Sequence, residues 1–595
     1  MDAQRFIAEF RHIVSAPNGV PKLRELVLVL AMQGRLVPQA SGETASELLD
    51  RIDVEKSSIG KHSSKLPELA VTGASNPIPA NWAWVRFGDI AIHNSGKTLD
   101  SVRNSGQPRD YITTSNLYWG RFDLGNLRRM LIRDEELERC TARKNDLLIC
   151  EGGEAGRAAV WTSETEVCFQ NHIHRARFFG SIDPFFAYRF FEKLNATGEI
   201  NDHRKGMGIS NLSSKSLAMI PFPLPPTEEQ SRIVAKVDEL MALCDRLEAQ
   251  QQSRRQLQTA LRRATLQALA STTSPAELHT AWTRLADNFG QLFSAPEDVD
   301  ELRSLCVELA IRGELVSSDA APTEDNSRSS LADEPFPIPK SWRWIRFDDL
   351  LRNSESGWSP KCDAEPRKPG EWGVLKVSAV TWGEFRPQEN KRLPPSLEPR
   401  PEAEVKPGDF LLSRANTAEL VARSVVVPDD VPEKLLMSDK IIRLNFADPE
   451  RKAWANLVNN SLYARDYYRR NATGTSASMR NVSRQVIHGL PIPLPPKPAQ
   501  QATLEKLTRL QRWYNLLEQQ LRDARKLAER VATAAVSSLT GIAIEQEEAP
   551  VKASKTELFA PLHLGKSPNL QAGARDDKPR RGTFVGGALV RVRSQ

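Results

Sequence analysis

The two halves of the sequence repeat one another in the same order. Residues 77–90, PIPANWAWVRFGDI, and residues 337–350, PIPKSWRWIRFDDL, are identical at eight of fourteen positions, including both members of a Trp-x-Trp pair. The other matches are LRELVLVLAMQGRLV (23–37) with LRSLCVELAIRGELV (302–316), YWGRF (118–122) with TWGEF (381–385), NDLLIC (145–150) with GDFLLS (408–413), and IPFPLPP (220–226) with LPIPLPP (490–496). Five collinear matches predict a chain built from two copies of one unit of about 240 residues.

Each copy is predicted to contain the same parts in the same order. An apolar leader helix ends near a glycine, Gly34 or Gly313, and a polar linker follows. A globular module then begins at the Trp-x-Trp block and closes at a proline cluster, because proline stops regular structure. After it, Thr227 to Gln230 offers a capping box for a long helix. The predicted parts are a leader-helix region over 1–40, a linker over 41–76, a first module over 77–226, a long helix over 227–270, a second leader helix and linker over 271–336, a second module over 337–496, a second long helix over 497–540 and a flexible basic tail over 541–595.

The modules are predicted to have a mixed α/β fold. Short β-branched and aromatic runs, such as WVRFGDI, DYITTSNL, DLLIC and RAAVW, are broken by Gly, Pro and Asn. Runs of this kind are typical of the strands of a twisted sheet. The expected fold class is therefore α/β (α+β), with two such modules separated by two long helices and related by a pseudo-two-fold duplication.

The long helices carry apolar residues at alternating spacings of three and four. The two series are Ile233, Val237, Leu240, Cys244 and Leu247, and Leu507, Leu510, Tyr514, Leu517 and Leu521, with Ala524, Ala528, Val531 and Ala535 beyond them. At an offset of 270 residues both series share one register, which favours an a/d seam between the two helices. Because the copies are duplicates within one chain, the pairing is predicted to be antiparallel. An ordinary amphipathic helix packed on its own module is the alternative.

Composition sets the broad class of protein. The chain has 595 residues, of which 40% are hydrophobic, and no apolar run approaches the roughly 20 residues that span a bilayer. The six cysteines include no CxxC pair, so neither a disulfide framework nor a zinc ribbon is indicated, and the N-terminal residues lack the layout of a secretory signal. A cytoplasmic protein is expected. The net charge of +6 is compatible with binding nucleic acid.

Three candidate catalytic or ligand-binding motifs are each incomplete. Lys97 follows a glycine as in a phosphate loop, but the first glycine of that motif would fall at Ala91. Cys168, His172 and His174 lie close together without further ligands at metal-binding spacing. The glycine turn 152–157 lacks the helix and acidic residue of a dinucleotide fingerprint. We therefore expect no catalytic, cofactor-binding or metal-binding residues in this chain.

Basic and polar residues in probable loops predict a DNA-binding surface on both modules. Arg and Lys neutralise phosphates, Arg can bind guanine through two hydrogen bonds, and Asn can do the same for adenine. The candidates are Lys97, Arg103, Arg109, Arg128, Arg129, His174, Arg175, Arg177, Arg204, Lys205, Asn211, Ser213 and Lys215 in the first module, and Lys361, Arg367, Lys368, Arg414, Arg469, Arg470, Arg480, Asn481, Ser483 and Arg484 in the second. For Asn211 and Ser213, contact with a base edge and capping of a turn are both open.

The ordered blocks resemble the specificity (S) subunit of type I restriction-modification systems. The resemblance covers about residues 20–540, and LAMQGRLVPQ (30–39) is similar to the leader of that family. It implies two target-recognition domains that each bind one half of a split double-stranded DNA site, with the long helices as a ruler and a dock. It further implies partners: two modification subunits that methylate adenine with S-adenosylmethionine, and restriction subunits that use ATP and Mg²⁺. It carries no catalytic residue over to this chain.

Two other classes of protein are consistent with the residues alone. An autonomous DNA-binding regulator would share the basic modules but need no methyltransferase. A scaffold whose modules grip proteins would show little salt dependence, because only phosphate contacts make affinity fall steeply with salt.

Overall fold

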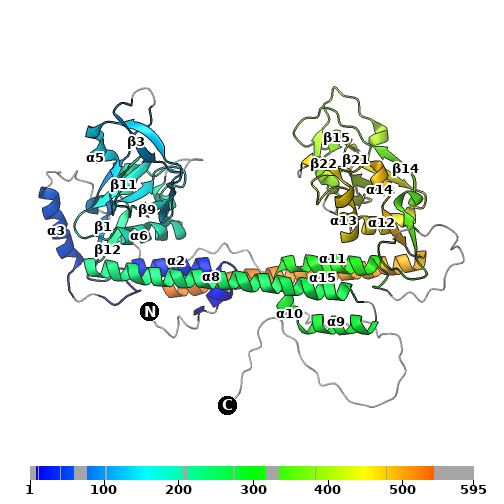
Figure 1. Ribbon diagram of the computed structural model, residues 1–595, viewed down its shortest axis with the longest axis horizontal. Helices are drawn as coiled ribbons and strands as arrows, with labels where there is room; N and C mark the ends of the chain where they lie inside the picture. The colour runs from blue at the N-terminus through cyan, green and yellow to red at the C-terminus, as the bar shows by residue number, and fades with distance from the viewer. Residues whose placement is uncertain are drawn as a thin grey trace, which may run out of the picture. The chain divides into compact units, whose positions relative to one another are not determined.

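The fold is that of a computed structural model, which describes residues 9–541 apart from residues 11, 40–41, 59–76, 101–103, 205–210, 273–274, 317–330, 332–333, 382 and 477–478. The described chain divides into two compact units (Figure 1). The first unit holds the residues up to 255 together with those from 524 onward, and the second holds residues 256–523. Each unit therefore contains the far end of a long helix that belongs to the other copy of the repeat. The predicted tail lies outside the described residues beyond 541.

Two four-stranded sheets form the body of the first module. One has the order β2-β11-β8-β9 and is antiparallel throughout, and the other has the order β6-β3-β10-β7 with β3 and β10 parallel. The bounds are β2 Ala91–Ser95, β3 Gln107–Ile112, β6 Arg128–Ile132, β7 Thr141–Ala142, β8 Leu147–Cys150, β9 Ala158–Val160, β10 Val167–Phe169 and β11 Ile173–Phe178. Helix α6, Pro184–Ala196, packs on the first sheet with Phe186 and Phe191 fully buried. The prediction of a mixed α/β module is confirmed.

The second module repeats this plan. Its antiparallel sheet has the order β14-β21-β17-β19, and a second sheet has the order β16-β15-β20 with β15 and β20 parallel. A third sheet, β18-β23-β22, lies in the same module. The bounds are β14 Leu351–Ser356, β15 Gly373–Leu375, β16 Asn390–Arg392, β17 Phe410–Ser413, β18 Ala415–Asn416, β19 Ser424–Val426, β20 Leu435–Leu436, β21 Ile441–Phe446, β22 Thr473–Ser476 and β23 Met479–Asn481, with helices α12 Lys452–Asn460 and α13 Leu462–Asn471.

The first and last strands of each module pair with each other. Strand β1, Ala83–Arg86, is antiparallel to β12, Pro221–Leu224, and β13, Arg343–Arg346, is antiparallel to β24, Pro491–Leu494. The proline clusters are thus strands, which corrects the expectation that proline ends regular structure there. A two-stranded sheet tolerates proline because every strand is an edge, and an outward-facing N–H needs no partner. The pairing brings the entrance and exit of each module together.

In the first unit the leader helix lies against both long helices. Figure 1 shows α2, Gly19–Met32, beside α8, Thr227–Ala270. Arg24 Nη2 lies 2.7 Å from Asp245 Oδ1 and 2.9 Å from Glu248 Oε2 on α8. The last turn of α2 reaches α15, Lys497–Thr540, where Gln33 Nε2 donates to the carbonyl oxygen of Thr540 at 3.1 Å.

The second unit repeats these contacts at equivalent positions. Arg303 Nη2, on α11 Val299–Ile311, lies 3.4 Å from Asn515 Oδ1 and 3.4 Å from Glu518 Oε2 on α15. Arg312 Nη1 lies 3.4 Å from the carbonyl oxygen of Ala270, the last residue of α8. In both units the leader helix thus contacts the long helix of its own copy and caps the end of the long helix of the other copy.

The long helices have the predicted bounds, but most residues of their apolar series pack against other elements than predicted. Ile233 and Val237 pack into the first module, with Leu240 beside them. This part of the helix therefore follows the alternative prediction of an amphipathic helix packed on its own module. Leu247 lies beside the cluster that joins α2 to Ala535 and Val536. In the second helix, Tyr514 and Leu517 are buried against α11 and the end of α8 at Leu266 and Leu269, with Leu507, Leu510 and Leu521 beside them.

Three local expectations need correction. Residues 45–58 of the predicted linker form helix α3, Ala45–Ser58, in which Leu48 and Ile52 are fully buried. Residues 275–287 of the second predicted linker form helix α9, Pro275–Asp287. The predicted capping box at Thr227 is not formed, because Gln230 instead accepts from the amide of Asp183 at 2.8 Å. No helix among the described residues has both the length and the apolar content that crossing a bilayer requires.

Candidate nucleic-acid interface

Two of the three predicted DNA contacts on β11 lie inside the first module. His174 is fully buried, which lowers its pKa, and its Nε2 lies 2.9 Å from a backbone carbonyl oxygen. Arg175 is 2% exposed and donates to two backbone carbonyl oxygens at 2.9 and 2.7 Å. The prediction for His174 and Arg175 is wrong, because β11 is a central strand and not an exposed edge. Arg177 is a quarter exposed and binds the buried carboxylate of Asp146 through two hydrogen bonds of 2.9 and 2.8 Å.

Several other predicted cations are already paired with carboxylates. The pairs are Lys97 with Glu136, Arg109 with Asp134 at 3.0 Å, Arg129 with Asp110 at 3.0 Å, and Arg469 and Arg470 with Asp466. The Lys97 side chain is only 12% exposed, and its hydrogen bond lowers the pKa of Glu136 to about 2. We correct Lys97 to a structural residue. The exposed pairs contribute at most about 1 kcal/mol each, so their arginines can open towards a phosphate.

A third group of predicted contacts braces the backbone. Arg204 Nε donates to the carbonyl oxygen of Ala155 at 2.9 Å, Arg367 Nη1 to that of Glu371 at 2.7 Å, and Arg480 Nη1 to that of Gly474 at 2.9 Å. Burial lowers the pKa of Arg204 and of Arg367. An arginine held by a carbonyl keeps its loop in place, so Arg204 and Arg367 act on the shape of the surface.

The two predicted Asn-x-Ser segments have the same geometry. Ser213 is the N-cap of α7, Ser214–Ala218, and accepts from a backbone N–H at 3.2 Å, and Ser483 does the same for α14, Arg484–His488. Of the two roles left open for Ser213, capping is the one observed. The neighbouring Asn211 forms a backbone bridge to Gly152, and Asn481 pairs with Ala415. Each segment therefore lies beside the turn that follows the central strand of its module.

Five of the remaining candidates have no side-chain partner within the described part of the chain. Among the described contacts, none involves the side chains of Arg128, Lys215, Lys361, Lys368 and Arg414. Arg484 Nη2 donates to Ser356 Oγ at 2.6 Å. Arg103 and Lys205 lie outside the described residues. Within the described part of the chain, no group of three His, Cys, Asp or Glu side chains is placed to hold a metal ion.

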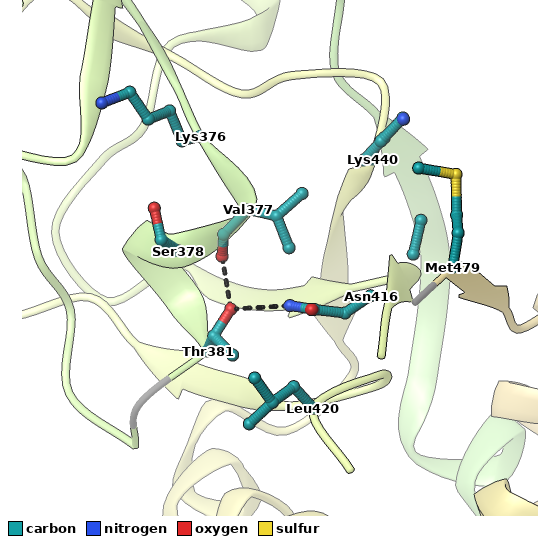
Figure 2. Close-up of a pocket in the computed structure, with 9 residues that line it drawn as sticks. Lys376, Val377, Ser378, Thr381, Asn416, Leu420, Lys440 and Met479 are labelled. Carbon is teal, nitrogen blue, oxygen red and sulfur yellow. Dashed lines mark hydrogen bonds between the residues drawn. The ribbon is translucent and has the colours of Figure 1, made fainter. Parts of the chain in front are cut away.

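The second module contains a hollow of about 380 Å³ that the sequence did not reveal. It is lined by Lys376, Val377, Ser378, Thr381, Ala415, Asn416, Leu420, Lys440 and Met479 (Figure 2). Asn416 Nδ2 donates to Thr381 Oγ1 at 3.3 Å, and Thr381 Oγ1 donates to the carbonyl oxygen of Val377 at 2.6 Å. Two lysines and an amide thus share one small space with apolar walls.

These lining residues come from four segments far apart in the sequence, which is why no local motif marks them. One signal was available. Thr381 opens the TWGEF block that matches YWGRF in the first copy, and the two blocks differ in charge and size at the first and fourth positions. The two copies have therefore diverged at this place.

Known proteins resemble this chain along most of its length. Residues 79–254 match the family model described as type I restriction modification DNA specificity domain. The type I restriction enzyme EcoEI specificity subunit of Escherichia coli is 31% identical over 80% of this chain and 86% of its own length. The EcoAI specificity subunit, also of Escherichia coli, is 26% identical over 58% of this chain and 64% of its own length. A crystal structure of the HsdS subunit from Thermoanaerobacter tengcongensis is 15% identical and covers 79% of this chain and 99% of that chain, with a TM-score of 0.37.

These similarities give no support to an autonomous regulator or to a protein-binding scaffold. The identity to the EcoEI subunit extends over four fifths of this chain. The chain belongs to the specificity subunits of type I restriction enzymes.

Proposed function

We propose that this chain selects the DNA sequence on which a type I restriction-modification complex acts, with each module binding one half of a split, asymmetric site. The observation that carries the proposal is the duplication. Two modules of one backbone plan are held by equivalent helix contacts, yet differ in the side chains beside their central turns. One chain with two different modules can bind an asymmetric site, whereas a symmetric homodimer is limited to palindromes.

The chain itself is the non-catalytic subunit, and the chemistry belongs to partners. We expect it to dock two adenine methyltransferase subunits, which use S-adenosylmethionine, and restriction subunits, which use ATP and Mg²⁺. The long helices and leader helices form the surface that both copies share, so one kind of partner can bind twice. Such a complex works on double-stranded DNA in the cytoplasm.

Exchange of one module tests the proposal. Residues 77–226 are replaced by the corresponding module of a relative, and methylated adenines are mapped in DNA from cells that carry the complex. One half of the methylated sequence is expected to change while the other half stays the same. A simultaneous change of both halves would refute one module per half-site.

A salt titration distinguishes DNA recognition from protein scaffolding. The logarithm of the affinity for duplex DNA is expected to fall with the logarithm of the salt concentration by about 0.9 per phosphate contact. A flat response, with no duplex retained, would favour the scaffold.

A further inference from the structure

The two modules can be aligned through their backbone hydrogen bonds. In the first module the amide of Glu151 donates to the carbonyl oxygen of His172 at 2.8 Å, and in the second the amide of Arg414 donates to that of Lys440 at 2.9 Å. Leu212 N to Glu151 O (2.8 Å) and Val482 N to Arg414 O (2.9 Å) match in the same way. The parallel pair Tyr111 and Cys168 corresponds to Val374 and Leu436. These matches assign an equivalent residue to most positions around the hollow.

The equivalent place in the first module is filled. Tyr118 stands where the second module has Thr381. The Arg157 guanidinium lies 5.7 Å from the centre of the Tyr118 ring, and its Nη2 donates to the carbonyl oxygen of Thr114 at 2.7 Å. Gly153, which has a positive φ of 74° and open space beside it, stands where the second module has Asn416. The first module therefore has an aromatic side chain, with an arginine beside it, at the place where the second module has the smaller Thr381.

The charge of the hollow limits what can enter it. Lys376 Nζ lies 3.7 Å from Glu389 Oε2, and Ser378 Oγ donates to the same carboxylate at 2.7 Å. Within the described part of the chain, no residue pairs with the ammonium group of Lys440. An ammonium group only donates, so its ligand must present acceptors. Among DNA bases, guanine presents two adjacent acceptors, N7 and O6, at its major-groove edge.

We propose that this hollow is a base-reading site of the second module, in which Lys440 binds a guanine of the half-site. The inference rests on the proposed function and adds the residue and the base. Asn416 forms a polar wall of the hollow, and Leu420 and Met479 form apolar walls (Figure 2). The first module, with Tyr118 in place of Thr381, reads a different base there.

The test uses the complex purified through a tag on the full chain and a pool of duplexes with random sequence. Bound duplexes are sequenced for the unchanged chain, for Lys440→Ala and for Lys406→Ala. Lys406 is an exposed lysine of the same module outside the hollow and is not a predicted DNA contact, so it controls for loss of charge. Lys440→Ala is expected to lower the preference for guanine at one position of one half-site by roughly 5- to 150-fold, the range for a specific base contact. The other half-site and the Lys406→Ala consensus are expected to stay unchanged.

A second variant puts the aromatic side chain of the first module at the edge of the hollow. Thr381→Tyr is expected to change the preferred base at the same position and at no other. The inference is overturned if Lys440→Ala binds with its consensus intact at every position, or if the loss is equal at all positions. If the unchanged chain yields no bipartite consensus at all, the proposed function itself fails, so the two failures are distinguishable.

Discussion

The ion pair between Lys97 and Glu136 shows how one lysine can hold two segments of the first module together. Lys97 follows β2, and Glu136 ends the short 3-10 helix Asp134–Glu136. The hydrogen bond from Lys97 lowers the pKa of Glu136 from 4.5 to about 2. The pair therefore stabilises the fold fully above about pH 4.5, and this stability is lost as the pH falls from 4.5 towards 2.

Lys97→Met is expected to remove part of that acid sensitivity. The free energy of unfolding in urea is measured between pH 2 and pH 6 for the full chain and the variant. The variant is expected to be less stable at pH 6 and to lose less stability on acidification. Lys144→Met is the control, because Lys144 pairs with Glu164 on the surface, where both side chains are more than half exposed. Equal pH profiles for Lys97→Met and the unchanged chain would contradict the assignment.

Arg262 allows a second test at the residue scale. Its side chain is 4% exposed and lies 2.8 Å from the fully buried carboxylate of Asp298 and 2.8 Å from Glu301. Arg262→Met removes the cationic partner of the buried Asp298 carboxylate, which keeps its bonds from the amides of Ser294 and Ala295, so the expected cost is about 3–5 kcal/mol of unfolding free energy. Arg24→Met removes an arginine whose two carboxylate partners are exposed, and the expected cost is at most about 1 kcal/mol. Similar losses of unfolding free energy for the two variants would contradict the expectation that burial makes the Arg262 ion pairs more important.

Side-chain roles were the least predictable part of the site. The alternation in NHIHRAR suggests a strand with one polar face, but it cannot say that both faces of β11 are covered, so Arg175 was assigned to DNA although it is buried. For Ser213 the sequence allows a base contact or a cap, and in the structure its side chain caps the helix that follows. Lys440 was missed because its neighbours in space, such as Lys376 and Asn416, are distant in sequence.

At the scale of elements, each leader helix ends against the entrance of its module. Gly34 and Gly313 follow the two leader helices with positive φ values of 64° and 77°. A Cβ atom at Gly34 would lie 2.3 Å from Pro79 Cγ, and one at Gly313 would lie 2.4 Å from Pro339 Cγ. Glycine is thus required both by the left-handed turn and by the close approach of the module.

Gly34→Ala and Gly313→Ala are each expected to destabilise the chain by more than about 2 kcal/mol, from backbone strain of roughly 1–2 kcal/mol and overpacking of roughly 1–3 kcal/mol. Gly408→Ala is the matched control. Gly408 also has a positive φ, 73°, but open space around it, so only the strain is expected. The measurement is the shift of the unfolding transition in denaturant. If Gly34→Ala lowers the unfolding free energy no more than Gly408→Ala does, the close contact between the leader helix and the module is not tight enough to exclude a Cβ atom.

Elements with strong patterns were predicted well from the sequence. The bounds of α8 and α15 follow from their apolar series and from the prolines before them. Helix α3 was missed because its surroundings are polar, although Thr44 and Glu47 form a capping box in which the amide of Thr44 donates to Glu47 at 2.8 Å. The proline strands were missed because proline alone does not tell whether a neighbouring edge is free to accept it.

At the scale of the whole chain, neither copy of the repeat is complete without the other. The carbonyl oxygen of Thr540 is capped by Gln33, and that of Ala270 is close to Arg312, so each leader contacts the end of a helix from the other copy. A polypeptide limited to residues 1–272 carries a leader and a long helix end but lacks the partner for each. It is expected to form a two-fold dimer, since a second copy supplies both missing contacts.

Sedimentation gives the mass of that half-length polypeptide, and sequencing of the duplexes it retains gives its preference. A dimer that prefers a palindrome built from one half-site is the expected outcome. A stable folded monomer would contradict the reciprocal role of the helix ends.

The exchanged helix ends also suggest how such a chain originated. An ancestral protein with a single copy could have made these contacts only by forming a dimer, and the dimer would have been confined to palindromic sites. In a chain that joins two copies, the contacts at the helix ends are made within one molecule, and the two modules need not be identical. Mutations at one place, such as the exchange of Tyr118 for Thr381, could then alter one half of the target without disturbing the other half. On this view, the contacts by which one copy caps the other stay constant while the DNA specificity of each module changes.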